Sequence, residues 1–261
     1  MRGPLVLGAG GRVGTMWRRL AAQGLWPGPE PVWHTRDGRD GTLAWDMGGP
    51  PPPWRAPPGG LVVLARGDEP ALARAALALA ARDGSAPVLL ASSQAAYGDV
   101  PQPCREDGPA LPSGAYGRAK LALEAEASGA CALRIGNVAG AGALFDAMAA
   151  GPVTLDRLPD GSAPRRQWVG PLALARAVVA LLALPALPPL LNLAQPGLVP
   201  MDAVLRAAGV PFAWRDNPAA LPSVEMDLSR LQALAPLPPA TPETLVSEAR
   251  LAGWRPHGEA P

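Results

Sequence analysis

Short apolar runs alternate with helical stretches through the first half of the chain. An apolar run without polar alternation predicts a strand that is buried on both faces of a sheet. We expect such strands at 5–7, 31–34, 61–64, 87–92 and 132–135. Helices are expected at 13–23, at 70–82 and from Tyr116 to about Ala127. Strands that alternate with helices predict an α/β fold with a doubly wound parallel sheet.

The second half of the chain follows a looser pattern. We expect a short helix at 143–150, a polar, turn-rich segment at 153–167, an apolar helix at 172–184 and a strand at 190–193 that returns to the main sheet. From Pro200 onward the sequence predicts short helices and Pro-rich connections. The predicted domains are therefore a sheet domain over 1–150, completed by about 170–195, and a small interleaved C-terminal lobe over 151–261.

Charge and composition exclude several classes of function. The net charge of +1 gives no electrostatic reason to expect nucleic acid or anionic lipid as a partner. The most apolar segment, 171–194, contains Arg176 and is interrupted by Pro185, Pro188 and Pro189, so no membrane span is expected. Cys104 and Cys131 are too few for a disulfide framework, and the two histidines are too few for a zinc site. These observations predict a globular cytoplasmic protein without a metal.

A glycine-rich stretch follows the first predicted strand and opens the first predicted helix. Glycine lets the backbone turn sharply, and the free N–H groups of a helix N-terminus attract a pyrophosphate. The position of the stretch between strand and helix therefore predicts a dinucleotide site. Its cofactor-binding residues would be Gly8, Gly10, Gly11, Arg12, Val13 and Gly14.

The end of the second predicted strand bears on the choice of dinucleotide. An acid at this point usually binds the adenosine ribose hydroxyls of NAD. Here the run is His34-Thr35-Arg36-Asp37, and Arg36 could pair with a 2′-phosphate. Arg12 could reinforce that preference. The sequence therefore favours NADP(H), while Asp37 keeps NAD(H) open.

The only lysine, Lys120, stands four residues after Tyr116, one of two tyrosines. Residues i and i+4 of a helix project from the same face. An ammonium beside a phenol favours the phenolate, which suits a residue that exchanges a proton with a carbonyl oxygen. The pair is therefore predicted to be catalytic, the alternative being a solvated helix face.

Ser93 lies near the C-terminal end of a predicted strand, where open α/β sheets bind ligands. Its hydroxyl could donate to a substrate carbonyl oxygen. A Ser-Ser pair at this place, Ser92-Ser93, also serves often as a loop cap.

Together these motifs resemble the extended short-chain dehydrogenases/reductases, specifically the NAD(P)-dependent epimerase/dehydratase group. The resemblance covers most of the chain and implies a Rossmann fold with a small C-terminal substrate lobe. It rests on the glycine spacing, Asp46-Met47, Ser93 before Tyr97-Gly98, the Tyr116 and Lys120 pair, the run RIGNVAG at 134–140 and Asp227-Leu228-Ser229-Arg230.

The resemblance implies catalytic roles for three residues. Tyr116 would be the general acid/base, Lys120 would assist it and hold the nicotinamide ribose, and Ser93 would orient the carbonyl. The reaction would move a hydride between the nicotinamide and a carbonyl or carbinol carbon.

It also implies binding residues. Asp46 and Met47 would lie at the adenine, and Leu64 and Ala65 would complete the cofactor site. Asn137 and Arg166 match positions that contact a substrate diphosphate, with Arg165 as a competitor for the second position. A permanently charged, bidentate arginine suits that contact.

The chain departs from the resemblance in two places. The family's acidic stretch before the helix near Leu174 is replaced by Pro171-Leu172-Ala173-Leu174-Ala175, which leaves the geometry of the lobe open. The chain is also shorter than the usual sugar-nucleotide epimerases, which allows a smaller ketone as substrate. The alternative function is a non-catalytic NADP-binding sensor or assembly factor on the same fold. The resemblance also implies a possible homodimer.

Overall fold

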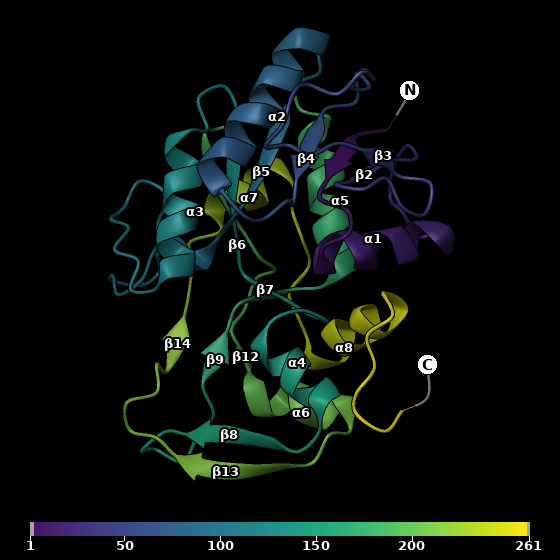
Figure 1. Cartoon of the computed structure of the whole chain (residues 1–261). Coiled ribbons are helices and arrows are strands. Elements are labelled where there is room, and N and C mark those ends of the chain that lie inside the picture. The colour runs from purple at the N-terminus through teal and green to yellow at the C-terminus, as the bar shows by residue number, and fades with distance from the viewer. Residues whose placement is uncertain (1–2, 260–261) are drawn as a thin grey trace.

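Seven parallel strands form the central sheet in the computed structural model, which describes residues 3–259 (Figure 1). The strand order is β11-β6-β5-β4-β1-β2-β3. The strands are β1 (Leu5–Leu7), β2 (Val32–Thr35), β3 (Leu43–Ala44), β4 (Leu61–Val63), β5 (Val88–Ser93), β6 (Cys131–Ile135) and β11 (Leu190–Leu193). The order reverses next to β1, which is where doubly wound sheets bind ligands.

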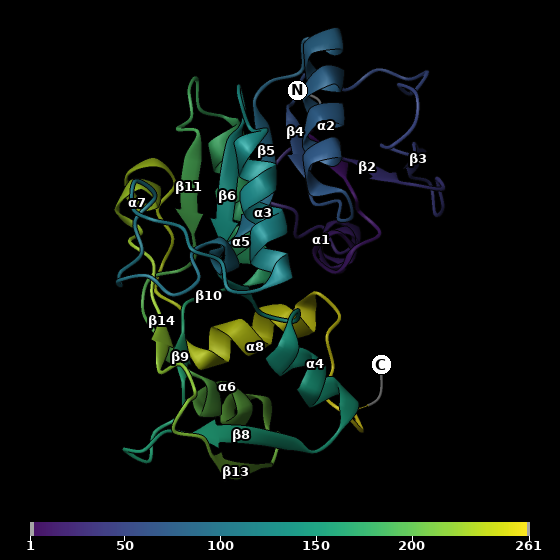
Figure 2. The same ribbon diagram turned by 60° about the vertical axis from the view of Figure 1, so that its left-hand side comes forward.

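Helices cover both faces of this sheet (Figure 2). Val6 faces α1 (Arg12–Ala22) and α5 (Pro171–Leu182), and its neighbours Leu5 and Leu7 face α2 (Glu69–Asp83) and α3 (Ala115–Ala125). Successive strand residues point to opposite faces, so one short apolar strand supplies two cores. The predicted doubly wound parallel sheet is confirmed.

The connection from β3 to β4 carries no helix. Trp45 and Trp54 pack edge to face there, with ring centroids 6.0 Å apart. Asp83 at the end of α2 accepts a hydrogen bond from Ala56 N at 2.7 Å. The hydrogen bond from Arg82, aided by that N–H, outweighs burial and lowers the pKa of Asp83 to about 2. A carboxylate thus fixes a Pro-rich loop for which the sequence predicts no regular structure.

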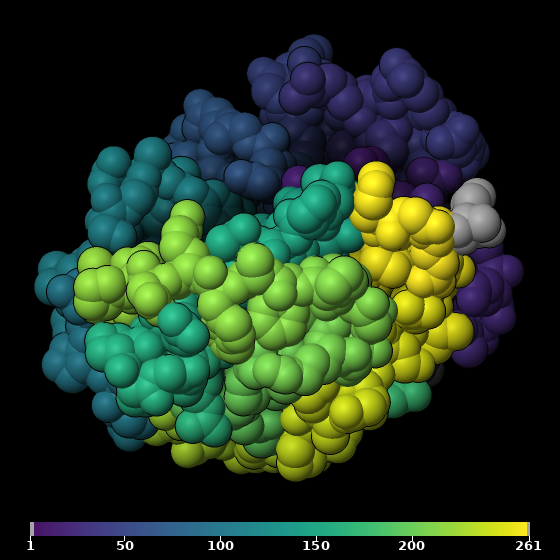
Figure 3. Space-filling model, turned by 90° about the horizontal axis from the view of Figure 1, so that it is seen from below, coloured from purple at the N-terminus to yellow at the C-terminus, as the bar shows by residue number. Residues whose placement is uncertain are grey.

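The C-terminal lobe lies below the sheet in Figure 1 and fills the foreground of Figure 3. Phe145 lies at its centre, with ring centroids 4.9 Å from Trp254 and 5.7 Å from Trp168. Its elements are β7 (Asn137–Val138), α4 (Ala143–Ala150), β8 (Val153–Arg157), β9 (Arg165–Arg166), β10 (Trp168–Val169), β12 (Val199–Pro200), α6 (Met201–Ala208), β13 (Phe212–Asp216), β14 (Ser223–Val224) and α8 (Pro242–Leu251). A further helix, α7 (Ser229–Leu234), packs beside β11.

Two features of the lobe differ from the sequence prediction. The segment 153–167, predicted to be turn-rich, contains β8, which pairs in parallel with β13. Helix α4 shares its buried core with the lobe, whereas the predicted domain boundary at 150 groups it with the sheet. The paired strands β8 and β13 are far apart in the sequence, so local patterns do not reveal that they pair.

The N-terminus of α5 is capped by a residue of the lobe. Leu172 N and Ala173 N donate to Glu248 Oε2 at 2.9 and 3.0 Å. A Cβ on Gly170 would lie 2.0 Å from that oxygen, so the approach needs glycine. A carboxylate at this end also interacts favourably with the helix dipole. Glu248 of α8 therefore supplies the acid that the run 171–175 lacks.

No helix within residues 3–259 combines the length and apolar character that a bilayer crossing requires. The same residues contain no cluster of three or more His, Cys, Asp or Glu side chains suited to a metal ion.

Candidate functional site

The glycine-rich turn joins β1 to α1 beside the end of β4. Gly8 has a φ of 85°, and a Cβ there would lie 2.4 Å from Ala65 N. A Cβ on Gly14 would lie 2.5 Å from Ala9 Cα, so the helix also packs closely on the turn. No side chain caps the helix at Gly11. The turn therefore leaves the N-terminal backbone N–H groups of α1 without a side-chain acceptor, where a pyrophosphate can approach.

His34 fastens this turn to β2. Gly8 N donates to His34 Nδ1 at 3.3 Å, and the opposite ring nitrogen, Nε2, donates to Trp45 O at 2.8 Å. Burial lowers the pKa of His34 by desolvation, while the hydrogen bond to Trp45 acts in the opposite direction. The ring is therefore neutral, with its proton on Nε2. From the sequence, His34 is considered only as a metal ligand, although its position in the strand after the glycine-rich stretch is a usable signal for this role.

Arg36 and Asp37 follow directly on β2. Arg36 is exposed and forms no ion pair with another residue in the range 3–259. Asp37 pairs with Arg39 and accepts a hydrogen bond from Thr35 at 3.2 Å. Although desolvation opposes it, these two interactions lower the pKa of Asp37. The acid is thus engaged within its own turn, while the Arg36 guanidinium is available.

Asp46 and Met47 follow β3 at the edge of the sheet. Asp46 is exposed and accepts from Gly48 N at 3.2 Å, whereas Met47 is buried. Arg12 pairs with Asp146 of α4, so this guanidinium reaches towards the lobe. Its predicted contribution to phosphate binding stays a prediction.

Tyr116 and Lys120 lie on one face of α3, as the spacing predicts. Lys120 Nζ is 5.8 Å from the centroid of the Tyr116 ring. The Cζ of Arg66, in the loop after β4, is 4.8 Å from the same centroid. Tyr116 is 43% exposed, so solvent and ligands can reach the phenol. Arg66 immediately follows Ala65, and it therefore links the tyrosine to the glycine turn.

Lys120 is itself almost fully buried. Its Nζ donates to Glu69 Oε2 and to Ala91 O, both at 2.8 Å. The exposed fractions of the two side chains are 3% for Lys120 and 4% for Glu69. Glu69 is not among the residues predicted from the sequence, because an acid in the first turn of a helix is usually solvated and interacts with the helix dipole. The ammonium beside Tyr116 is therefore charge-compensated.

Ser93 ends β5 next to α3. Its Oγ accepts from Ala95 N at 3.2 Å and caps the short turn η1 (Gln94–Ala96). A Cβ on Gly117 would lie 2.2 Å from Ala95 O, so glycine lets α3 pack directly on this turn. The capping bond uses a lone pair of Ser93, and the hydroxyl hydrogen stays available as a donor. The cap and the predicted carbonyl contact are thus compatible.

Asn137 and Arg166 lie on the lobe side. Gln94 Nε2 donates to Asn137 Oδ1 at 3.1 Å, which joins β7 to the turn after Ser93. Arg166 donates only to backbone carbonyls, those of Arg165 at 2.7 Å and Leu221 at 3.1 Å. Burial lowers the pKa of Arg166 by desolvation. No acid is recorded beside Arg166 within residues 3–259, whereas Arg165 is exposed.

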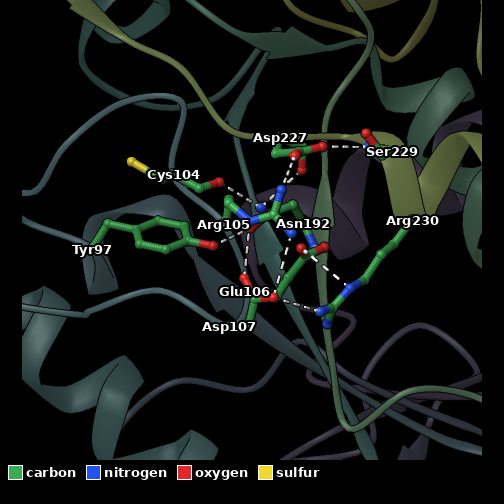
Figure 4. Close-up of polar contacts among 9 residues, drawn as sticks. All are labelled: Tyr97, Cys104, Arg105, Glu106, Asp107, Asn192, Asp227, Ser229 and Arg230. Carbon is green, nitrogen blue, oxygen red and sulfur yellow. Dashed lines mark hydrogen bonds and ion pairs between the residues drawn. The ribbon is translucent and has the colours of Figure 1, made fainter.

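A polar network around Asn192 holds the loop between β5 and α3 (Figure 4). Tyr97 Oη donates to Asn192 Oδ1 at 2.7 Å, and Asn192 N donates to Glu106 Oε1 at 2.9 Å. The Asn192 amide donates to the carbonyls of Cys104 and Asp227. Further ion pairs join Arg105 to Asp227 and Arg230 to Glu106. The segment 227–230 is therefore part of the scaffold of this loop.

Known structures share this architecture at low sequence identity. A UDP-glucose 4-epimerase from Brucella ovis in complex with NAD has a TM-score of 0.74 and 19% identity, over 98% of this chain and 100% of that chain. RMD from Pseudomonas aeruginosa complexed with NADPH has a TM-score of 0.73 and 16% sequence identity, over 97% of this chain and 99% of that chain. A short-chain dehydrogenase/reductase superfamily protein from Agrobacterium tumefaciens with bound NAD has a TM-score of 0.71 and 17% sequence identity, over 95% of this chain and 96% of that chain.

The chain has the fold of the short-chain dehydrogenases/reductases. No protein-family model and no curated protein sequence matches it. The likeness thus covers the whole architecture and leaves the chemistry to the residues of the site.

Proposed function

We propose that the protein is an NAD(P)-dependent oxidoreductase or epimerase/dehydratase of the extended short-chain dehydrogenase type. The observation that carries this proposal is the placement of Tyr116 and Lys120 on one face of α3, 5.8 Å apart from ring centroid to Nζ. The loop of Arg66 connects this face to the glycine turn at Ala65. A proton-transfer group beside a dinucleotide turn is the arrangement that carbonyl reduction requires.

The residues of the first half fit a nicotinamide dinucleotide. The cradle at Gly8 and Gly14 has no room for a Cβ, and the N-terminus of α1 has no side-chain cap. Backbone N–H groups from Arg12 onward would hold the pyrophosphate. Arg36 would pair with a 2′-phosphate, because Asp37 is engaged with Arg39. NADP(H) is therefore the favoured cofactor, and the likeness extends to structures with either NADPH or NAD.

The bound nicotinamide would supply hydride transfer. Tyr116 would give a proton to the carbonyl oxygen during reduction, or accept one from the carbinol during oxidation. Ser93 would donate a hydrogen bond to the same oxygen. Lys120 would hold the nicotinamide ribose and favour the ionised phenol. General acid/base assistance of this kind contributes about 10²–10⁴-fold to a rate.

We further propose a substrate with an anionic group. Arg166 is a half-buried guanidinium without a recorded acid partner in residues 3–259. A desolvated cation gains most from an anion that binds beside it. The amide nitrogen of Asn137 provides a second donor, since its oxygen is already bonded to Gln94. These contacts suit the diphosphate of a sugar nucleotide or the phosphate of a smaller ketone.

The test is NADPH consumption with a panel of sugar nucleotides and simple ketones. Tyr116→Phe should lower kcat on any substrate found by about 10²–10⁴-fold and leave NADPH affinity unchanged. Tyr97→Phe is the matched control, because it removes the only other phenol and should retain kcat. Wild-type kcat in Tyr116→Phe would refute the mechanism. NADPH binding without turnover across the whole panel would favour a non-catalytic NADP-binding sensor instead.

A further inference from the structure

Two ion pairs of the described residues have both side chains almost fully buried. One is Glu69–Lys120, with exposed fractions of 4% and 3%, and the other is Glu124–Arg134, with 9% and 4%. Burying a carboxylate and a cation carries a desolvation penalty that the pair seldom repays in stability. The Cζ of Arg134 lies 4.2 Å from the centroid of the Tyr97 ring, so this pair belongs to the scaffold of the loop between β5 and α3. Glu69–Lys120 instead lies against the predicted catalytic tyrosine.

Glu69 reaches Lys120 from α2, the helix that packs beside α3. It is the first residue of α2, and Asp68 caps the helix by accepting from Ala71 N at 3.1 Å. The capping role is therefore taken by Asp68, and the Glu69 carboxylate is not needed for it. Three residues before Glu69, Arg66 stacks on Tyr116. Glu69 and Tyr116 thus approach Lys120 from two different helices.

The contacts of Lys120 fix the direction of its ammonium. An ammonium has three N–H donors. Two are used by Glu69 Oε2 and Ala91 O, at 2.8 Å each. One N–H is left for the phenol oxygen of Tyr116 or a ribose hydroxyl. Without Glu69, the flexible lysine side chain would be held by a single backbone carbonyl.

Glu69 also carries the negative charge that pairs with the buried ammonium of Lys120. Desolvation favours the neutral amine of a buried lysine, and an adjacent carboxylate favours the ammonium. Arg66, whose Cζ is 4.8 Å from the centroid of the Tyr116 ring, carries a charge of the same sign as Lys120. Glu124, also on α3, is occupied by Arg134 and Ser92. Glu69 is the only acid within residues 3–259 that is recorded as a partner of Lys120.

We propose that Glu69 is a positioning residue that keeps Lys120 charged and directs its remaining N–H towards the phenol oxygen of Tyr116 or a hydroxyl of the cofactor ribose. This inference rests on the proposed function for its catalytic meaning. The geometry of the pair can be tested without any substrate.

The first experiment follows Lys120 by NMR with lysine labelled at its side-chain nitrogen. Because the chain contains one lysine, one side-chain signal reports its protonation. In Glu69→Gln the ammonium should lose its proton at a lower pH than in the wild type, because the adjacent carboxylate charge is removed. Glu124→Gln is the matched control, since it removes the other buried carboxylate and should leave the lysine titration unchanged. An identical titration in wild type and Glu69→Gln would overturn the proposal.

The second experiment follows Tyr116 through the absorbance of its phenolate in a Tyr97→Phe background. Only Tyr116 then contributes. An ammonium that no longer directs its N–H at the phenol should move this ionisation to higher pH in Glu69→Gln, whereas a merely structural pair would change only the unfolding temperature. Glu69→Asp keeps the charge but shortens the reach, so it should retain the wild-type titration and weaken NADPH binding. It also serves as the second variant if Glu69→Gln does not fold.

The outcomes separate the two proposals. If both titrations shift as expected while Tyr116→Phe retains wild-type kcat, the role of Glu69 stands and the proposed mechanism fails. If neither titration shifts while Tyr116→Phe loses activity, the mechanism stands and Glu69 is structural. With active enzyme, the pH dependence of kcat should shift to higher pH in Glu69→Gln and not in Glu124→Gln.

Discussion

The glycine turn follows β1 and the Tyr116–Lys120 corner lies against β5, with β4 between the two strands, yet the two regions are specified over different ranges of the sequence. The turn is defined by backbone space within residues 8–14, where Gly8 and Gly14 allow approaches that a Cβ would block. The corner is completed by Glu69, which is 51 residues from Lys120. Backbone constraints are therefore visible in a local motif, whereas the charge balance of the corner becomes visible only when the helices are assembled.

The largest expected effect concerns the backbone half of this comparison. Gly8→Ala should lower the free energy of unfolding by about 2–4 kcal/mol and abolish dinucleotide binding, because a positive φ and a backbone contact at 2.4 Å both oppose a Cβ. Chemical denaturation and NADPH titration measure the two effects. Gly24→Ala is the control: Gly24 also has a positive φ, 72°, but faces open space, so it should retain NADPH binding. Equal losses in both variants would show that φ alone matters.

Replacing Glu248 tests whether long-range contacts also support the lobe. Glu248→Ala should lower the free energy of unfolding by about 1–2 kcal/mol, because two N–H groups at the start of α5 lose their acceptor. Ser247→Ala, on the exposed side of the same helix, should change it by less than about 0.5 kcal/mol. Thermal unfolding measures the stability of both variants. Equal stability of the two would show that the Glu248 cap does not stabilise the fold.

The choice of dinucleotide should depend on one exposed side chain. Arg36→Ala should weaken NADPH binding by about tenfold and leave NADH binding unchanged, since a charged contact to a phosphate contributes about 1.5 kcal/mol. Arg39→Ala is the control, because Arg39 pairs with Asp37 in the same loop. Fluorescence titration with each dinucleotide gives the ratio. An unchanged ratio in Arg36→Ala would contradict the preference for NADP(H).

The smallest effect is a dependence of the glycine turn on pH. The pKa of His34 is lowered in the folded protein by desolvation, so the unfolded chain binds more protons. Stability and NADPH affinity should therefore be complete above the ordinary histidine value of about 6.5 and decrease as the pH falls through it. His34→Gln should lose this dependence, whereas His257→Gln should keep it. A pH-independent wild type would disprove the role of His34.

The sequence predicted the main sheet because each of its longer strands is an uninterrupted apolar run beside a helix with clear ends. The spacing of Tyr116 and Lys120 predicted their common face for the same reason. The sequence could not predict the pairing of β8 with β13, because this pairing depends on cross-strand contacts such as the ion pair of Arg157 with Asp216. Glu69 and Glu248 were also out of reach, because a glutamate in a helix is usually solvated. Only the tertiary fold determines which carboxylates are buried.

The solitary lysine has a practical consequence. An endoprotease that cleaves after lysine has one target bond in 261 residues, and that bond lies inside α3 with its side chain 97% covered. Intact protein should resist such a protease, and a single cut at Lys120 would report the opening of this helix. An amine-reactive label should likewise fail to modify the buried Lys120 while the protein is folded. The chain thus contains its own reporter of whether the Tyr116–Lys120 corner is closed.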